Sequence, residues 1–186
     1  MGLLNLFRRR PYERTAYELY GAVVAQARSP AYYAALGVPD SVLGRFDMVG
    51  LFAVLLVRRL TDDADPRGRA LSQAVFDAMF ADMDHNLREM GVGDLVVGKR
   101  IKRLAEAFNG RAHAYDAAID DPSELPLVAA LSRNVWRSEE IAPGAAALAA
   151  HVRAQAAHLA SQPLADMLAG AVRFLPAPDA LPAAAP

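Results

Sequence analysis

Residues 69–119 read RALSQAVFDAMFADMDHNLREMGVGDLVVGKRIKRLAEAFNGRAHAYDAAI, and this stretch predicts two amphipathic helices joined by the turn Gly91–Asp94. In both halves, apolar residues recur at spacings of three and four, which places them along one face of a helix. The apolar faces consist of Phe76, Met79, Phe80, Met83, Leu87 and Met90 in the first helix and of Ile101, Leu104, Phe108, Ala112, Tyr115 and Ile119 in the second. We expect the two faces to pack on each other or on a shared core.

The charged residues are divided unevenly between these two helices. The first carries Asp77, Asp82, Asp84 and Glu89, and the second carries Lys99, Arg100, Lys102, Arg103 and Arg111. We expect some of these side chains, Arg100 and Arg111 on the second helix and Asp82 and Glu89 on the first, to pair at the helix interface, because a guanidinium group can bind a carboxylate through two hydrogen bonds. A surface that faces a partner is the alternative for the same residues.

Composition narrows the classes of protein to consider. The chain has 186 residues, of which 54% are apolar, so it can bury one sizeable core. The net charge of -1 provides no general attraction for nucleic acid. The absence of cysteine excludes disulfides, thiolate metal sites and cysteine catalysis, and it fits a reducing cytoplasm. The longest apolar run, residues 48–57, is too short to span a bilayer.

The remainder of the chain also predicts helices, so the expected fold class is all-α. Further helices are expected at residues 11–28, 30–36, 42–60, 123–136, 145–161 and 163–174, with Ser29, Ser41 and Asp94 as N-caps. Together these segments predict a single-domain bundle of about seven to eight helices over residues 11–174. An Ala/Pro-rich tail, residues 175–186, is expected to be disordered.

Residues 1–10 are expected to form a separate flexible segment in which apolar residues precede basic ones. Leu3, Leu4, Leu6 and Phe7 come before Arg8–Arg10. This order predicts either a short anchor on an anionic membrane surface or a terminus partly docked on the body of the protein.

Two further groups of side chains are candidates for a site. Asp82, His85 and Glu89 share one helix face, and carboxylate and imidazole groups at this spacing can hold a metal ion. No similar motif occurs on another helix, so ordinary surface charges and ion pairs are the favoured interpretation. The basic cluster of residues 99–103 can contact phosphates of RNA or lipid. It lacks the interleaved aromatic residues that stack on bases, so specific DNA binding is not expected.

No catalytic motif is present in the sequence. There is no nucleophile-elbow arrangement and no glycine-rich loop between a strand and a helix that would cradle phosphate. We therefore expect a protein that binds a partner and is not an enzyme.

Four blocks of the sequence resemble the ubiquinol–cytochrome c chaperone family of bacteria and mitochondria. They are Leu19–Tyr33, Gly37–Phe46, Leu71–Gly93 and Lys99–Tyr115, and they follow the order and spacing of the family over most of residues 15–120. The resemblance implies partner-binding positions at Arg45, Asp47, Asp82, Asp84, Arg88, Glu89, Asp94, Lys99, Arg100, Arg111 and Tyr115. The chain departs from the family pattern at Val96–Gly98, where a cap and a first-turn proline are missing, so we expect the second helix to start later or more loosely.

The resemblance implies a non-enzymatic assembly chaperone without a cofactor. Its partner would be newly made cytochrome b during assembly of the ubiquinol–cytochrome c reductase complex, at a cytoplasmic location peripheral to the inner membrane. In mitochondria such proteins act with a small partner at the ribosome, so a ribosome- or RNA-associated helical adaptor is the alternative. We expect a groove beside the first helix of residues 69–119 to receive the client, with Met79, Met83 and Met90 either filling the core or supplying an adaptable surface.

Overall fold

A computed structural model describes residues 12–179 of the chain. The predicted N-terminal segment, residues 1–10, and the final residues of the predicted tail, 180–186, lie outside the described residues. The described part is all-helical and contains no strand, which confirms the predicted fold class. Its elements are α1 (Glu13–Ala27), α2 (Pro30–Ala34), α3 (Val42–Thr61), α4 (Pro66–Glu89), α5 (Asp94–Asp120), α6 (Leu125–Leu131), a π-helical turn (Ser132–Trp136), α7 (Ala145–Ala160) and α8 (Leu164–Leu168).

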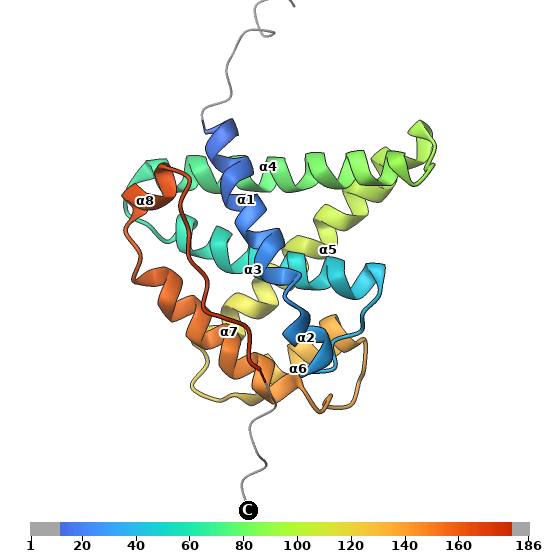
Figure 1. The fold of residues 1–186 in the computed structure, drawn as a ribbon, viewed down its shortest axis with the longest axis vertical. Helices are drawn as coiled ribbons and strands as arrows, with labels where there is room; N and C mark the ends of the chain where they lie inside the picture. Colours follow the sequence, from blue (N-terminus) through green and yellow to red (C-terminus); the bar gives the residue numbers. More distant parts are fainter. Residues whose placement is uncertain (1–11, 180–186) are drawn as a thin grey trace, which may run out of the picture.

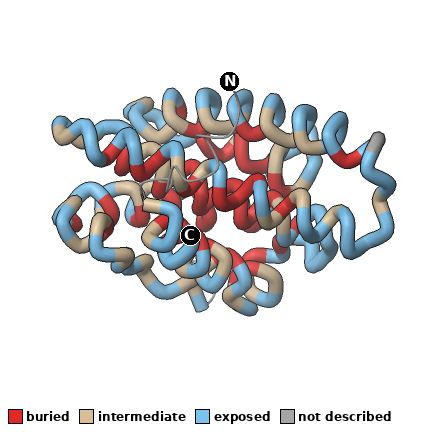
Figure 2. Tube along the Cα trace, turned by 90° about the horizontal axis from the view of Figure 1, so that it is seen from above, coloured by how far each residue is buried: buried red, intermediate tan, exposed pale blue. Residues whose placement is uncertain are grey.

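Helix α3 is the centre of the fold. Every residue from Asp47 to Leu56 is buried, so this segment is enclosed on all sides and not only along one stripe. Helices α1, α4, α5 and α7 pack around it (Figure 1). Figure 2 shows the buried residues gathered in the middle of the molecule, with exposed residues around them. The start of α3 is fixed as predicted, because the Ser41 hydroxyl accepts a hydrogen bond from the Gly44 backbone N–H at 3.0 Å.

Helices α4 and α5 form the predicted hairpin, and its turn projects from the body of the protein (Figure 1). The prediction that the second helix starts late is wrong, because α5 begins at Asp94. Gly91 ends the preceding helix with a φ of 79°, and Gly93 provides the N-cap backbone conformation of α5. Asp94 is thus not the N-cap. It lies in the first turn, where a carboxylate interacts favourably with the helix dipole, and Val97 is fully buried beneath it.

The segment predicted as one helix over residues 123–136 is divided in two. Helix α6 ends at Leu131, and the chain continues as a π-helical turn that closes at Arg137 in the left-handed conformation, with a φ of 57°. The Ser132 hydroxyl donates to the Val128 carbonyl and accepts from the Ala142 N–H, while the Ser132 carbonyl accepts from Ser138. These bonds to residues beyond the helix replace the regular α-helical pattern.

The C-terminal part also differs from the prediction. Helix α8 ends at Leu168, well before the expected end at residue 174, and Gly170 turns the chain with a φ of 88°. Residues 171–179 then run without helix across the body of the protein, along the side of α7 (Figure 1). The N–H and carbonyl of Leu175 both hydrogen-bond to the Gln155 side chain, so the ordered part of the chain extends beyond the predicted boundary at residue 174.

Candidate functional site

The predicted site residue Asp47 is a buried carboxylate held by two arginines. Its Oδ1 accepts from Arg111 Nη1 and its Oδ2 accepts from Arg137 Nη2, each at 2.8 Å. Only 1% of the Asp47 side chain is exposed. Burial raises the pKa of the Asp47 carboxyl, and the positive charges of Arg111 and Arg137 oppose that rise. Arg111 therefore pairs within the fold, as expected, but its partner lies on α3 and not on α4.

Tyr115 is the second predicted site residue in the interior, with 2% of its surface exposed. Burial raises the pKa of its phenol, which therefore stays protonated. Because neither Asp47 nor Tyr115 reaches the surface, the prediction of a direct partner contact is corrected for both. The pair of Asp47 and Arg111 joins α3 to α5, and Tyr115 is buried one turn after Arg111 on the same helix.

Three other predicted site residues form one exposed ion-pair cluster at the tip of the α4–α5 hairpin. Arg88 donates to Asp84 at 2.6 Å and to Asp94 across the turn. Glu89 is exposed beside this cluster, at the last position of α4. The cluster closes the hairpin and leaves its outer side accessible to a partner. Exposed pairs of this kind contribute little to stability.

Asp82 lies on α4 and faces α1. Its Oδ2 accepts a hydrogen bond from the Tyr20 hydroxyl at 2.9 Å. Burial and the adjacent carboxylate raise the pKa of Tyr20, so the phenol remains a donor. The predicted pairing of Asp82 with an arginine of α5 is therefore wrong. Within residues 12–179, no group of three His, Asp or Glu side chains is arranged to hold a metal ion.

Beside α4 the surface is hollowed by a groove of about 480 Å³, which we call the α3–α4 groove. It is lined by Tyr20, Val24, Arg28, Val42, Leu43, Arg45, Phe46, Val49, Asp82, Met83, Asn86, Leu87, Met90, Arg100 and Leu104. The location matches the groove predicted beside the first helix of residues 69–119. Four helices contribute to it, α1, α3, α4 and α5, so its shape depends on the packing of the whole hairpin.

Large apolar side chains are exposed along the α3–α4 groove. Val42 is 74% exposed, Leu43 57% and Met90 61%, whereas Met83 is buried in the floor. Met79, which was also a candidate for an adaptable surface, is fully buried and belongs to the core. Exposed apolar side chains around a concave surface are typical of a site that binds apolar segments of other molecules. An unbranched methionine at the rim can adapt to different contact surfaces.

The rim of the groove is predominantly basic. Arg28, Arg45 and Arg100 line it, against the single carboxylate of Asp82. Arg45 is partly neutralised, because it donates to Asp40 at 2.6 Å, and its guanidinium lies 5.6 Å from the centre of the Tyr33 ring. The groove therefore favours a segment that is apolar along its length and neutral or acidic at its edge.

The basic cluster of α5 continues from this rim along the exposed side of the helix. Lys99, Arg100, Lys102 and Arg103 are all exposed. Lys102 has an acidic neighbour in Glu106, at 3.9 Å. This cluster is exposed, and its contact with phosphates stays a prediction.

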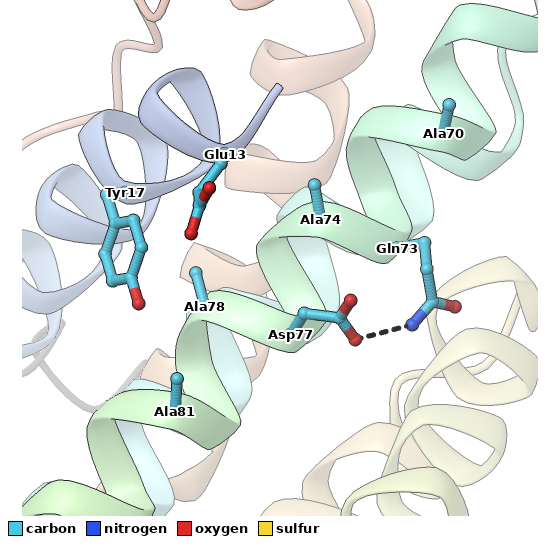
Figure 3. A pocket seen from close by; sticks show the side chains of 8 residues that line it. All are labelled: Glu13, Tyr17, Ala70, Gln73, Ala74, Asp77, Ala78 and Ala81. Carbon is cyan, nitrogen blue, oxygen red and sulfur yellow. Dashed lines mark hydrogen bonds between the residues drawn. The ribbon is translucent and has the colours of Figure 1, made fainter. Parts of the chain in front are cut away.

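A second hollow, of about 330 Å³, lies between the start of α1 and α4 (Figure 3). The α4 side consists mainly of alanines, and Glu13 and Tyr17 of α1 lie opposite them. The only hydrogen bond drawn among the lining residues joins Gln73 to Asp77, at 2.9 Å on one helix. This hollow brings together no nucleophile and base, so we assign it no chemistry.

A third hollow, of about 740 Å³, lies where α3 ends beside α5 and α7. Its charged residues are already paired within the fold. Arg58 donates to Asp120 at 2.6 Å, and Arg59 donates to Asp63 at 2.8 Å. Arg153 donates to the carbonyl of residue 118, in the last turn of α5, and to those of residues 121 and 123 after the helix. These contacts hold three helices together and do not form a site for a ligand.

Comparison with known proteins agrees with the geometry. The model of the family described as ubiquinol–cytochrome C chaperone matches residues 34–174. The chain belongs to this family. A crystal structure of the Cbp3 homolog from Brucella abortus is similar to it, with 38% sequence identity, a TM-score of 0.80, and coverage of 93% of this chain and 96% of that chain. No curated protein matches the chain significantly.

Membership of the family confirms the resemblance stated from the sequence. The coarse function that follows is that of a chaperone for assembly of ubiquinol–cytochrome c reductase. None of the helices within residues 12–179 is both long enough and apolar enough to cross a membrane.

Sequence reasoning missed several residues that build the site. Val42 and Leu43 belong to a helix that is apolar on most sides. The spacing of apolar residues in such a helix does not show which of them are exposed. Arg137 follows the predicted helix of residues 123–136, and its contact with Asp47 depends on the π-helical turn. The Tyr20–Asp82 bond joins residues 62 positions apart, which periodicity does not address.

Proposed function

We propose that this chain is a non-enzymatic assembly chaperone that binds newly made cytochrome b, with the α3–α4 groove as the client site. The observation that carries the proposal is the exposure of Val42, Leu43 and Met90 around a groove with a basic rim. An apolar membrane segment needs its surface covered before it reaches the bilayer or its other subunits, and such a groove can cover part of it.

The remaining predicted site residues have two roles under this proposal. Arg45 and Arg100 border the groove and are placed to meet the edge of the client. The pair of Asp84 and Arg88, with Asp94 and Glu89 nearby, lies on the hairpin tip next to Met90 and offers a charged contact beside the apolar one. We further propose a cytoplasmic location with peripheral contact to the inner membrane, where cytochrome b is inserted.

The test is a crosslinked affinity purification of the full chain from its native host after membranes are solubilised. Wild-type protein is expected to enrich cytochrome b, and the double variant Leu43→Glu/Met90→Glu is expected to lose it. A matched control is the double variant Leu125→Glu/Ile141→Glu, which alters two exposed apolar residues outside the groove, 71% and 55% exposed. Equal loss in both variants, or no enrichment of cytochrome b by the wild type, would contradict the proposal.

A ribosome- or RNA-associated adaptor is the second candidate, and the exposed basic cluster of α5 favours it. Contacts between lysine or arginine and phosphate weaken steeply as salt increases. Ribosome co-sedimentation that is lost at high salt and after Lys99→Ala/Arg103→Ala, but is unaffected by Leu43→Glu/Met90→Glu, would support this function in place of the client groove.

A further inference from the structure

The C-terminal strap, residues 171–179, is bound to the rest of the chain as a peptide ligand would be. Arg173 donates its N–H to Gln162 Oε1 at 2.9 Å, and its carbonyl accepts from Gln162 Nε2 at 2.7 Å. Leu175 repeats this arrangement with Gln155, at 3.0 Å and 2.8 Å. Each glutamine side chain thus pairs with the N–H and carbonyl of one residue, as a neighbouring β-strand does.

A third glutamine, from α1, completes the contact. Gln26 Nε2 donates to the Leu175 carbonyl at 2.9 Å. All five of these hydrogen bonds join a side chain of the body to the main chain of the strap, which donates in two of them and accepts in three. This recognition is independent of the side chains of Arg173 and Leu175, so it is open to any extended polypeptide.

Selectivity comes from the residues that alternate with these two positions. Val172 and Phe174 pack against the core, and the Phe174 ring meets the ring of buried Phe52 edge to face, with centroids 5.6 Å apart and an interplanar angle of 86°. Main-chain hydrogen bonds at every second residue, with apolar side chains entering the body at the residues between, are the features of strand-like peptide recognition.

The glutamines that bind the strap are held in place by contacts within the body of the protein. With the strap in place, Gln155 is fully buried and Gln162 is 5% exposed, so a segment that replaces the strap has to satisfy the same polar groups. Gln155 Nε2 also lies 3.0 Å from His151 Nε2, which is 2.9 Å from the Tyr32 hydroxyl, and Gln26 donates to that hydroxyl at 2.6 Å. These fixed contacts reduce the entropy lost on binding a peptide.

We propose that the surface formed by α1, α7 and the turn between α7 and α8 is a binding groove for an extended polypeptide segment with apolar residues two positions apart, and that the strap occupies it in cis. The occupant in trans is a client segment of this pattern, which takes the place of the strap. The bound strap shows that a segment of this pattern fits the groove. The groove is separate from the α3–α4 groove, and the choice of a client segment as its occupant rests on the proposed function, whereas binding of an extended peptide does not.

The experiment uses the full chain and a fluorescein-labelled peptide with the sequence of residues 171–179, AVRFLPAPD, and it measures fluorescence anisotropy. In the wild type the strap lowers the apparent affinity, because only the fraction of molecules with an open groove can bind. The variant Phe174→Ala weakens the strap, so the peptide is expected to bind it at least about tenfold more tightly than the wild type. Arg173→Pro, which removes the N–H donated to Gln162, is expected to have the same effect without altering the core.

Two controls isolate the groove. Addition of Gln155→Leu to Phe174→Ala is expected to weaken peptide binding at least about tenfold, because the Leu175 N–H loses its acceptor and the carbonyl keeps only Gln26 as a donor. A peptide with an N-methylated leucine at the position of Leu175 keeps every side chain but lacks the N–H, and we expect a similar loss. Circular dichroism establishes that each variant is folded.

The proposal is overturned if folded Phe174→Ala and Arg173→Pro bind the peptide no better than the wild type. It is also overturned if the N-methylated peptide binds as well as the unmodified one. Dimerisation of the wild type that Gln155→Leu abolishes would assign the groove to the strap of a second copy instead.

Discussion

The carboxylate of Asp47 joins three parts of the chain that are distant in sequence. Its two arginine partners are 64 and 90 positions away, on α5 and after the π-helical turn. Burial removes the carboxylate from water, and the ion pairs with arginine offset that free-energy cost. If one arginine is lost, the cost stays the same and less of it is offset. We therefore assign this contact to stability and to the position of α5, and not to binding.

The first prediction concerns Arg111→Met. We expect the free energy of unfolding to fall by about 3 kcal/mol, because a buried charge is left with one of its two partners. The measurement is urea unfolding followed by circular dichroism. Arg100→Met, on the same helix but at an exposed position, is the matched control and should change stability by no more than about 0.5 kcal/mol. Similar values for the two variants would show that the Asp47 contact is not structural.

The second prediction concerns pH and His151. Gln155 Nε2 and the Tyr32 hydroxyl both lie within hydrogen-bond distance of its Nε2. An amide nitrogen can only donate, so Nε2 is an acceptor and the imidazole is neutral. Burial lowers the pKa of His151. The contribution of the neutral ring to stability is thus present above the unfolded pKa, about 6.5, and is lost as pH falls through the lower folded pKa.

Urea unfolding at pH 7.5 and pH 5.5 tests this expectation. The wild type should lose more stability between these two values than His151→Asn does, with a difference of at most about 1.4 kcal/mol for each pH unit below 6.5. His113→Asn is the control, because it removes an exposed imidazole and leaves His151 in place, so the pH dependence caused by His151 should persist. If His151→Asn shows the same pH dependence as the wild type, His151 is not a neutral buried group.

At the scale of elements, the sequence predicted most helices but not the contacts that modify them. Periodicity and caps are local properties, so they gave α3 and the α4–α5 hairpin nearly within their observed bounds. The π-helical turn depends on Ser132 bonding to Ala142 and Ser138, and the strap depends on Gln155 and Gln162. Such long-range bonds leave no periodic pattern in the sequence.

The third prediction compares two glycines within helices. A Cβ at Gly44, in the first turn of α3, would overlap the carbonyl oxygen of Pro39, which is backbone and cannot move aside readily. Gly110, within α5, has open space around the same position. Gly44→Ala should therefore destabilise by about 2 kcal/mol. Gly110→Ala should stabilise by about 0.5–1 kcal/mol, because alanine favours the helix.

Thermal unfolding of the two glycine variants beside the wild type provides the measurement. The midpoint should fall for Gly44→Ala and rise for Gly110→Ala. A rise for both would mean that the chain before α3 does not need its close approach to the helix. A fall for both would mean that α5 requires the small residue at position 110 for a contact outside the described chain.

At the scale of the whole molecule, the body and the hairpin tip differ in packing. All residues from Asp47 to Leu56 in α3 are buried, whereas between Met83 and Val97 no side chain that the structure describes is buried. The tip is held mainly by the exposed pairs of Arg88. Backbone hydrogen bonds of the tip can therefore open without exposing the core, while those of α3 can open only when the protein unfolds.

The fourth prediction is that hydrogen exchange separates these two regions. Amides of residues 86–96 should exchange quickly, at rates insensitive to low concentrations of urea, because local opening exposes little surface. Amides of residues 48–56 should exchange slowly, and their rates should rise with urea as global unfolding does. A common urea dependence would instead mean that tip and body open together. Because Met90 at the rim of the α3–α4 groove lies on the tip, independent opening would allow the groove to widen for a client while α3 stays folded.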